Sequence, residues 1–195
     1  MHPALNRNLF LVKEHIGFFK VAKNYDIFDP ATNEKLLECR ENKMGFFTRY
    51  FRMTDYRRMT PFHIEVRSPE GEPVLSVNRR TTIIRSFVKV LNEHDQVVGG
   101  FRQRLLSIGG AFDVLGRDDQ PLCMLKGNWT SWEFRFLAGE NELARVSKKW
   151  SGLGKELFTS ADNYMLQISD EVPPDNPVRQ LILGAVLCID LVLKE

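Results

Sequence analysis

The stretch "PPDNPVRQLILGAVLCIDLVLKE", residues 173–195, decides the fold. Asn176 is a good helix N-cap and Pro177 suits the first helical position, so the stretch predicts a helix over residues 177–194. From Leu181 to Leu193 every residue except Asp190 is apolar or glycine, so all faces of this helix need burial, in a protein core or in lipid. The apolar run would extend roughly 20 Å, against about 30 Å of bilayer hydrocarbon. A core helix is therefore favoured over a membrane anchor.

The chain before this helix repeats one pattern five times. Each copy alternates apolar and polar residues from an aromatic start, breaks in a cluster rich in Asp, Asn, Gly or Pro, and then resumes with apolar residues. Alternation predicts a strand with one buried face, and the polar cluster predicts a turn, so each copy is a β-hairpin. The copies are "YDIFDPATNEKLLECRE", "FHIEVRSPEGEPVLSVNR", "FVKVLNEHDQVVGGFRQRL", "FDVLGRDDQPLCMLKG" and "FRFLAGENELARVSKKW".

Further strands at residues 9–13 and 164–169 bring the total to about twelve antiparallel strands. A closed barrel of about eight strands fills itself with side chains, whereas twelve leave a lumen that needs a filler. We therefore predict an all-β fold with one helix, a closed barrel of about twelve strands around the buried C-terminal helix. Residues 1–195 are expected to form one domain, with strands over 9–169, a linker over 170–176 and the helix after it.

Charge and cysteine content exclude several classes of protein. The net charge is only +2, too small to indicate binding to nucleic acid. Cys39, Cys123 and Cys188 are far apart and form no CxxC pair, so they indicate neither a zinc site nor a disulfide framework. A reducing, cytoplasmic setting fits best. The opening "MHPALNRNLFLVKEH" lacks the apolar core of a signal peptide.

Three stretches resemble the phospholipid scramblase family: "VSKKWSGLGKELFTSADNYMLQI", "LILGAVLCIDLVLKE" and "PFHIEVRSPEGEPVLSVNR". The likeness runs from about Phe19 to Leu193 and is most specific between Trp150 and Tyr164. That family is similar in fold to the tubby-like and LURP-one-related barrels, which wrap twelve strands around a C-terminal helix. The resemblance implies calcium-responsive movement of phospholipids between leaflets. The family's cysteine cluster would fall near "RRTTIIRS", residues 79–86, which has no cysteine.

The stretch "TSADNYMLQISDE" offers Asp162 and Asn163 as ligands of a weak calcium site. Calcium needs six to eight oxygens, usually with several carboxylates. The run "YMLQIS" alternates like a strand, which would hold Asp162 about 20 Å from Asp170. The resemblance implies an acidic residue where this chain has Ser160. We therefore favour an Asx-type turn leading into the last strand, with calcium as the alternative and no other cofactor.

Two basic stretches predict a surface for anionic lipid headgroups. Arginine forks suit phosphate oxygens, and neighbouring aromatic residues suit a headgroup interface. On a barrel these side chains could converge from adjacent hairpins. The alternative is a solvated face balanced by acidic turns. The predicted contacts are Arg49, Arg52, Arg57 and Arg58 in "RYFRMTDYRR" and Arg79 and Arg80 in "NRRTTIIR".

The tryptophans Trp129, Trp132 and Trp150 fit either a bilayer interface or packing between strands, and packing is favoured for Trp150. No GxSxG, HExxH or P-loop motif occurs, so we expect no covalent catalysis. The first hypothesis is a scramblase-like, non-enzymatic protein that binds anionic phospholipid, cytoplasmic or peripheral at a membrane. The alternatives are a soluble regulatory or binding scaffold without a lipid role, and a membrane protein anchored by residues 181–193.

Overall fold

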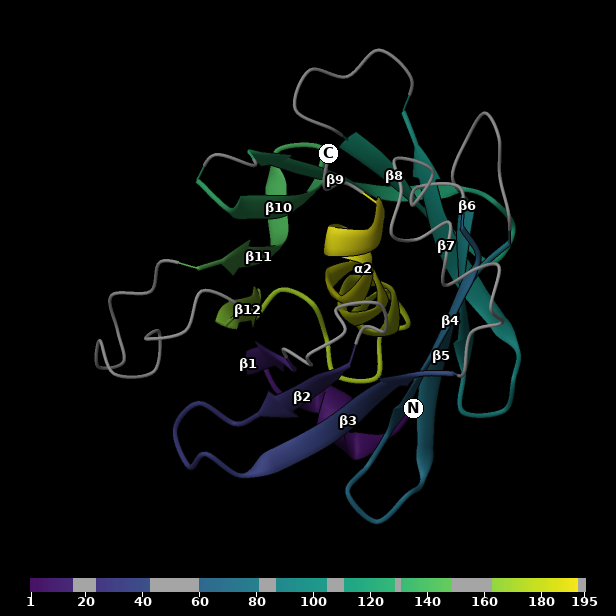
Figure 1. The fold of residues 1–195 in the computed structure, drawn as a ribbon. Coiled ribbons are helices and arrows are strands. Elements are labelled where there is room, and N and C mark those ends of the chain that lie inside the picture. The colour runs from purple at the N-terminus through teal and green to yellow at the C-terminus, as the bar shows by residue number, and fades with distance from the viewer. Residues whose placement is uncertain are drawn as a thin grey trace.

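The computed structural model describes residues 1–15, 24–42, 60–80, 87–104, 111–128, 131–148 and 163–192. In these ranges twelve strands close into one barrel, and a helix lies inside the ring of strands (Figure 1). The predicted twelve-stranded barrel around a C-terminal helix is therefore confirmed. Its elements are η1 (Pro3–Asn6), β1 (Leu9–Glu14), β2 (Tyr25–Phe28), β3 (Lys35–Glu41), β4 (Phe62–Arg67), β5 (Pro73–Arg79), β6 (Phe87–Asn92), β7 (Val97–Gln103), β8 (Ala111–Gly116), β9 (Pro121–Asn128), β10 (Glu133–Ala138), β11 (Asn141–Ser147), β12 (Asn163–Ile168) and α2 (Val178–Val192).

Every neighbouring pair of strands is antiparallel, and β2 to β12 follow one another in chain order. The five predicted hairpins are β2–β3, β4–β5, β6–β7, β8–β9 and β10–β11. Their polar clusters form the turns as expected, because Asn33, Asp95 and Asp119 adopt φ of 57°, 58° and 58°. Asn and Asp tolerate this left-handed backbone better than most residues. The barrel closes where β1 pairs with β12, in a register that places Leu9 opposite Gln167.

The helix α2 fills the barrel. Asn176 caps it as predicted, since its side-chain oxygen accepts a hydrogen bond from the Val178 amide at 3.0 Å. Residues 181–183 and 185–189 are all at most 3% exposed. The helix packs against β5, β6 and β7, and Gly184 allows a close approach there, because a Cβ at this position would lie 3.0 Å from a methyl group of Val90.

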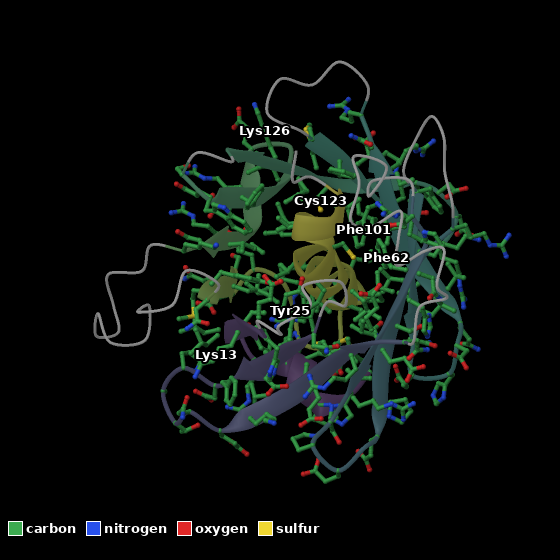
Figure 2. The ribbon with its side chains drawn as sticks, in the orientation of Figure 1. Lys13, Tyr25, Phe62, Phe101, Cys123 and Lys126 are labelled. Carbon is green, nitrogen blue, oxygen red and sulfur yellow. The ribbon has the colours of Figure 1, made fainter. Side chains whose placement is uncertain are left out.

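Strands such as β4 alternate between this core and the outside. In β4 the buried side chains of Phe62, Ile64 and Val66 interleave with more exposed neighbours. Figure 2 shows the same division on other strands, where Phe101 and Cys123 lie toward the helix and Lys126 lies outside. These strands therefore turn one face toward the interior of the barrel and the other toward the solvent.

One buried charge ties the start of α2 to the N-terminal segment. Arg179 is 1% exposed, and all five N–H groups of its guanidinium meet an oxygen atom. Burial lowers the pKa of Arg179, and the nearby carboxylates of Asp170 and Asp175 partly offset this. Nε donates to the Pro173 carbonyl (2.9 Å), Nη1 to the carbonyls of Leu5 (3.2 Å) and Arg7 (2.9 Å), and Nη2 to Asn8 Oδ1 (2.7 Å) and the Val172 carbonyl (2.6 Å).

Shortening a helix side chain inside the barrel should destabilise the whole domain. Leu187 is fully buried, so Leu187→Ala leaves a cavity and should lower the free energy of unfolding by about 2–5 kcal/mol in urea titrations. Leu122→Ala is the matched control, because Leu122 is 37% exposed and its loss should change the free energy by less than about 0.5 kcal/mol. Equal effects of the two variants would contradict a helix-filled core.

The buried guanidinium of Arg179, called the Arg179 fork here, should not be replaceable by another positively charged side chain. Lysine keeps the charge but offers three donors on one nitrogen, so Arg179→Lys leaves buried carbonyl groups without a donor. We expect the free energy of unfolding to fall by about 3 kcal/mol. Arg135→Lys serves as the control, since Arg135 is half-exposed and paired with Glu133, and a surface ion pair contributes less than about 1 kcal/mol. Stability of Arg179→Lys equal to that of the parent protein would refute the role of the fork.

Candidate lipid-interaction site

The structure describes three of the predicted site residues. Arg79 ends β5, Arg80 follows it, and Asn163 begins β12. The remaining predicted residues, Arg49, Arg52, Arg57, Arg58 and Asp162, lie outside the described residues.

Hydrogen bonds link Arg79 to the chain just before β4. The segment 43–59 joins β3 to β4, and β4 pairs with β5 in a register that places Phe62 opposite Arg79. Arg79 donates from Nε (3.1 Å) and Nη2 (2.7 Å) to the carbonyl of Thr60, which comes two residues after Arg58 in the sequence. The hydrogen bonds thus hold Thr60, just before β4, beside the end of β5.

Arg79 and Arg80 have different environments. The Arg79 side chain is 2% exposed, and its guanidinium lies 4.8 Å from the centre of the Phe62 ring. Arg80 is exposed. We predicted both as headgroup contacts, but in this conformation only Arg80 presents its charge to the solvent. Arg79 is held inside by the strand pairing, which puts its side chain on the inner side with Phe62 and Val77.

The three cysteines have unreactive environments. Burial raises the pKa of Cys123 to about 12, and it also raises the pKa values of Cys39 and Cys188. The positive charge of Arg79 opposes this shift at Cys188 without cancelling it. Because the thiolate is the nucleophilic form, these side chains behave as small apolar core residues.

An aromatic cluster joins the strands on either side of β1. Trp132 stacks on Tyr164 with ring centres 6.2 Å apart and meets Phe134 edge to face at 5.8 Å. Tyr164 in turn meets Tyr25 edge to face at 6.4 Å. The ammonium group of Lys148 lies 3.8 Å from the centre of the Trp132 ring. These contacts give Trp132 a packing role, one of the two roles that the sequence allowed. Trp150, for which packing was predicted, and Trp129 lie outside the described residues.

Asn163 lies within the last strand. It begins β12 and pairs with Lys13 across the barrel seam, so the predicted strand after "SADN" is present. Asp170 follows the other end of β12, where it accepts a hydrogen bond from Asn8. Within the described ranges, no three Asp, Glu, His or Cys side chains are grouped to hold a metal ion. Because Asp162 lies outside those ranges, the calcium site stays a prediction.

Comparison with known proteins identifies the family. A family model named Scramblase matches residues 8–195. The chain belongs to the scramblase family. Its relatives include phospholipid scramblase 1 of Mus musculus, 34% identical over 64 residues, and phospholipid scramblase 2 of Bos taurus, 27% identical over 132 residues. These matches cover 33% and 68% of this chain but only 19% and 39% of the relatives.

Two further matches cover nearly the whole chain. The altered inheritance rate of mitochondria protein 25 of Saccharomyces cerevisiae is 22% identical over 95% of this chain and 66% of its own length. The X-ray structure of a protein from Arabidopsis thaliana superposes with a TM-score of 0.54 over 97% of this chain and 94% of that protein, at 14% identity. This second likeness establishes a shared fold, the tubby-like barrel that we predicted.

The membrane-anchor alternative concerns the helix of this scramblase-family barrel. None of the helices in the described part of the chain combines the length and the apolar character needed to cross a bilayer. The side chains of α2 that a membrane anchor would expose to lipid, such as Leu183 and Val186, are 1% exposed inside the barrel. In this fold their apolar surface is already buried against strands.

Substitution of Trp132 tests whether this side chain stabilises the barrel by packing or contacts a bilayer. Trp132→Ala removes the stack on Tyr164 and the contact with Lys148, so the free energy of unfolding should fall by about 2 kcal/mol. Trp132→Phe keeps an aromatic ring and should lose less. The measurement is urea unfolding beside co-sedimentation with vesicles. Unchanged stability together with weaker vesicle binding would assign Trp132 to a membrane interface instead.

Proposed function

We propose that this scramblase-family protein binds anionic phospholipid headgroups at a membrane surface and assists phospholipid movement between leaflets without covalent catalysis. Membership of the family over residues 8–195 carries the proposal. The relatives named phospholipid scramblase 1 and 2 supply the class of ligand. We place the protein in the cytoplasm, peripheral at the membrane, with anionic lipid and no nucleic acid as its partner.

The headgroup contacts of this proposal are Arg49, Arg52, Arg57, Arg58 and Arg80. Arg79 has a supporting role, because its hydrogen bonds to Thr60 hold the start of β4 beside the end of β5. A rigid strand end next to a basic stretch would limit the positions that its guanidinium groups adopt. Arginine forks that converge from two stretches can bind phosphate oxygens in a bidentate manner, which suits a lipid headgroup.

The filled barrel favours binding over unaided transport. Headgroups need a polar path to cross a bilayer, and the interior of the described barrel is occupied by α2 and by apolar side chains such as Phe101, Phe134 and Leu187. Moving α2 into lipid would empty this interior and forfeit the burial that stabilises the fold. We therefore assign lipid binding at the outer surface to the barrel itself and an assisting role in lipid movement.

The arginine patch comprises Arg49, Arg52, Arg57, Arg58 and Arg80, and removing most of its charges should weaken vesicle binding. The purified full chain should co-sediment with vesicles that contain phosphatidylserine and not with vesicles of phosphatidylcholine alone. The variant with Gln at Arg49, Arg52, Arg57 and Arg58 should bind at least about tenfold more weakly, because each lost charged hydrogen bond costs about 1.5–3 kcal/mol. Each measurement is made with calcium and with chelator.

The matched control removes the same charge from arginines that are already ion-paired on the wall, namely Arg7, Arg67, Arg135 and Arg145. Gln at these four positions should leave vesicle binding nearly unchanged. Equal losses in both variants would show that only net charge matters and would refute a defined patch. Binding that requires calcium would support Asp162 and Asn163 as ligands. A parent protein that binds no vesicles would favour the soluble scaffold.

A further inference from the structure

A groove of about 370 Å³ lies on the outer wall of β6, β7 and β8. Gly99 and Gly116 face each other across β7 and β8 and contribute no side chains to its floor. Phe87, Lys89 and Arg102 line it from β6 and β7, and Arg117 and Asp119 line it from the turn after β8. The volume falls within the range of small-molecule sites in proteins.

The lining of this groove carries a surplus of positive charge. Lys89, Arg102 and Arg117 face the single carboxylate of Asp119, which leaves two positive charges uncompensated. None of the three cations forms an ion pair with a described carboxylate. Six other described arginines are neutralised locally, because carboxylates pair with Arg7, Arg40, Arg67, Arg104, Arg135 and Arg145.

Arg102 is the least satisfied of these groups. Its cross-strand neighbour is Asp113, but that carboxylate pairs with Arg104 at 3.3 Å. The Arg102 Nε atom is buried and donates no hydrogen bond to the described residues. A buried donor without an acceptor is costly, particularly in a charged group. A small rotation of the guanidinium toward the groove would let an anion accept from Nε and an Nη atom together.

Arg117 and Phe87 complete the arrangement. Arg117 Nε donates to the Val97 carbonyl at 3.2 Å, which anchors the side chain against the start of β7 and leaves its Nη groups without a described acceptor. Phe87 lies opposite Arg102, and its ring covers Gly100, where a Cβ would lie 3.1 Å from the ring. The groove thus has two guanidinium groups and an ammonium group beside one aromatic surface.

From this geometry we infer that the groove is a binding site for a phosphate monoester, with Arg102 and Arg117 on the phosphate oxygens and Phe87 against the ester carbons. A phosphate monoester carries a charge of about −1.5 to −2 at neutral pH, which matches the two uncompensated positive charges. A phosphate diester carries one negative charge and would leave one cation unmatched. The site does not depend on the arginine patch of the proposed function. The monoester can belong to a soluble metabolite or to a lipid headgroup.

Two ligands that carry the same glycerol phosphate group distinguish a soluble metabolite from a lipid as the source of the monoester. Glycerol 3-phosphate is soluble, whereas phosphatidic acid presents a glycerol phosphate monoester in a vesicle. Binding of the first is followed by NMR shifts of the Gly99, Gly100 and Gly116 amides in the full chain, and binding of the second by co-sedimentation. Phosphatidylglycerol vesicles supply the diester comparison. We expect saturable binding of at least one monoester, with weaker binding of the diester.

Arg102→Gln with Arg117→Gln should weaken monoester binding at least about tenfold. The control variant, Arg135→Gln with Arg145→Gln, removes the same charge from ion-paired positions on β10 and β11 and should bind normally. If the double variant unfolds, Arg117→Gln alone tests the site, because Arg117 is exposed. Gln at Arg49, Arg52, Arg57 and Arg58 should leave glycerol 3-phosphate binding unchanged, which separates this site from the arginine patch.

Binding of glycerol 3-phosphate that is lost in the Arg102 and Arg117 variant supports a soluble ligand. Binding to phosphatidic acid alone, lost in the same variant, supports a lipid ligand. The inference is overturned if neither monoester binds or if the Arg102 and Arg117 variant binds as well as the parent protein. It is also overturned if phosphatidic acid binds and phosphatidylglycerol binds as tightly, when both are tested on the chain with Gln at Arg49, Arg52, Arg57 and Arg58.

Discussion

The burial of α2 inside the barrel is the constraint on which the rest of the structure depends. A ring of twelve strands is too wide to fill with its own side chains, so the barrel needs the helix as much as the helix needs the barrel. The Arg179 fork fixes the helix at its N-terminal end by bonding to the segment before β1 and to the linker after β12. Those two segments flank the seam where the barrel closes.

The fold was predictable because its signals are local. Each hairpin shows alternating apolar and polar residues and a cluster of turn-forming residues within its own segment. The helix has no polar residue between Leu181 and Ile189, which indicates that all its faces are buried. The resemblance of three stretches to phospholipid scramblases predicted the family, and the family-model match over residues 8–195 confirms it. Arg179 gave no such signal. A single arginine near a helix start is ordinary, and only the meeting of η1, the linker and α2 turns it into a buried fork.

The sites were harder to predict because their residues are far apart in sequence. Sequence reasoning grouped arginines that are neighbours along the chain, and one of them, Arg79, proves to be buried beside Phe62. Lys89, Arg102 and Arg117 come singly from successive elements, so no window of the sequence shows them together. The sequence also does not show which of these cations lack a carboxylate partner. That depends on the cross-strand neighbours, because Asp113, which lies opposite Arg102, already pairs with Arg104. Unpaired cations of this kind can be identified once the strand register is known.

The pairing of β1 with β12 also sets the order of events in folding. Leu9 lies opposite Gln167, so the first strand has no partner on that edge until nearly the whole chain exists, and the helix that fills the interior is made later still. Chains are synthesised from the N-terminus, and unpaired edges and exposed apolar faces promote aggregation. The edge of β1 that pairs with β12 has no strand partner until residues 163–168 have been made. Closure of the barrel and filling of its interior therefore both depend on β12 and α2.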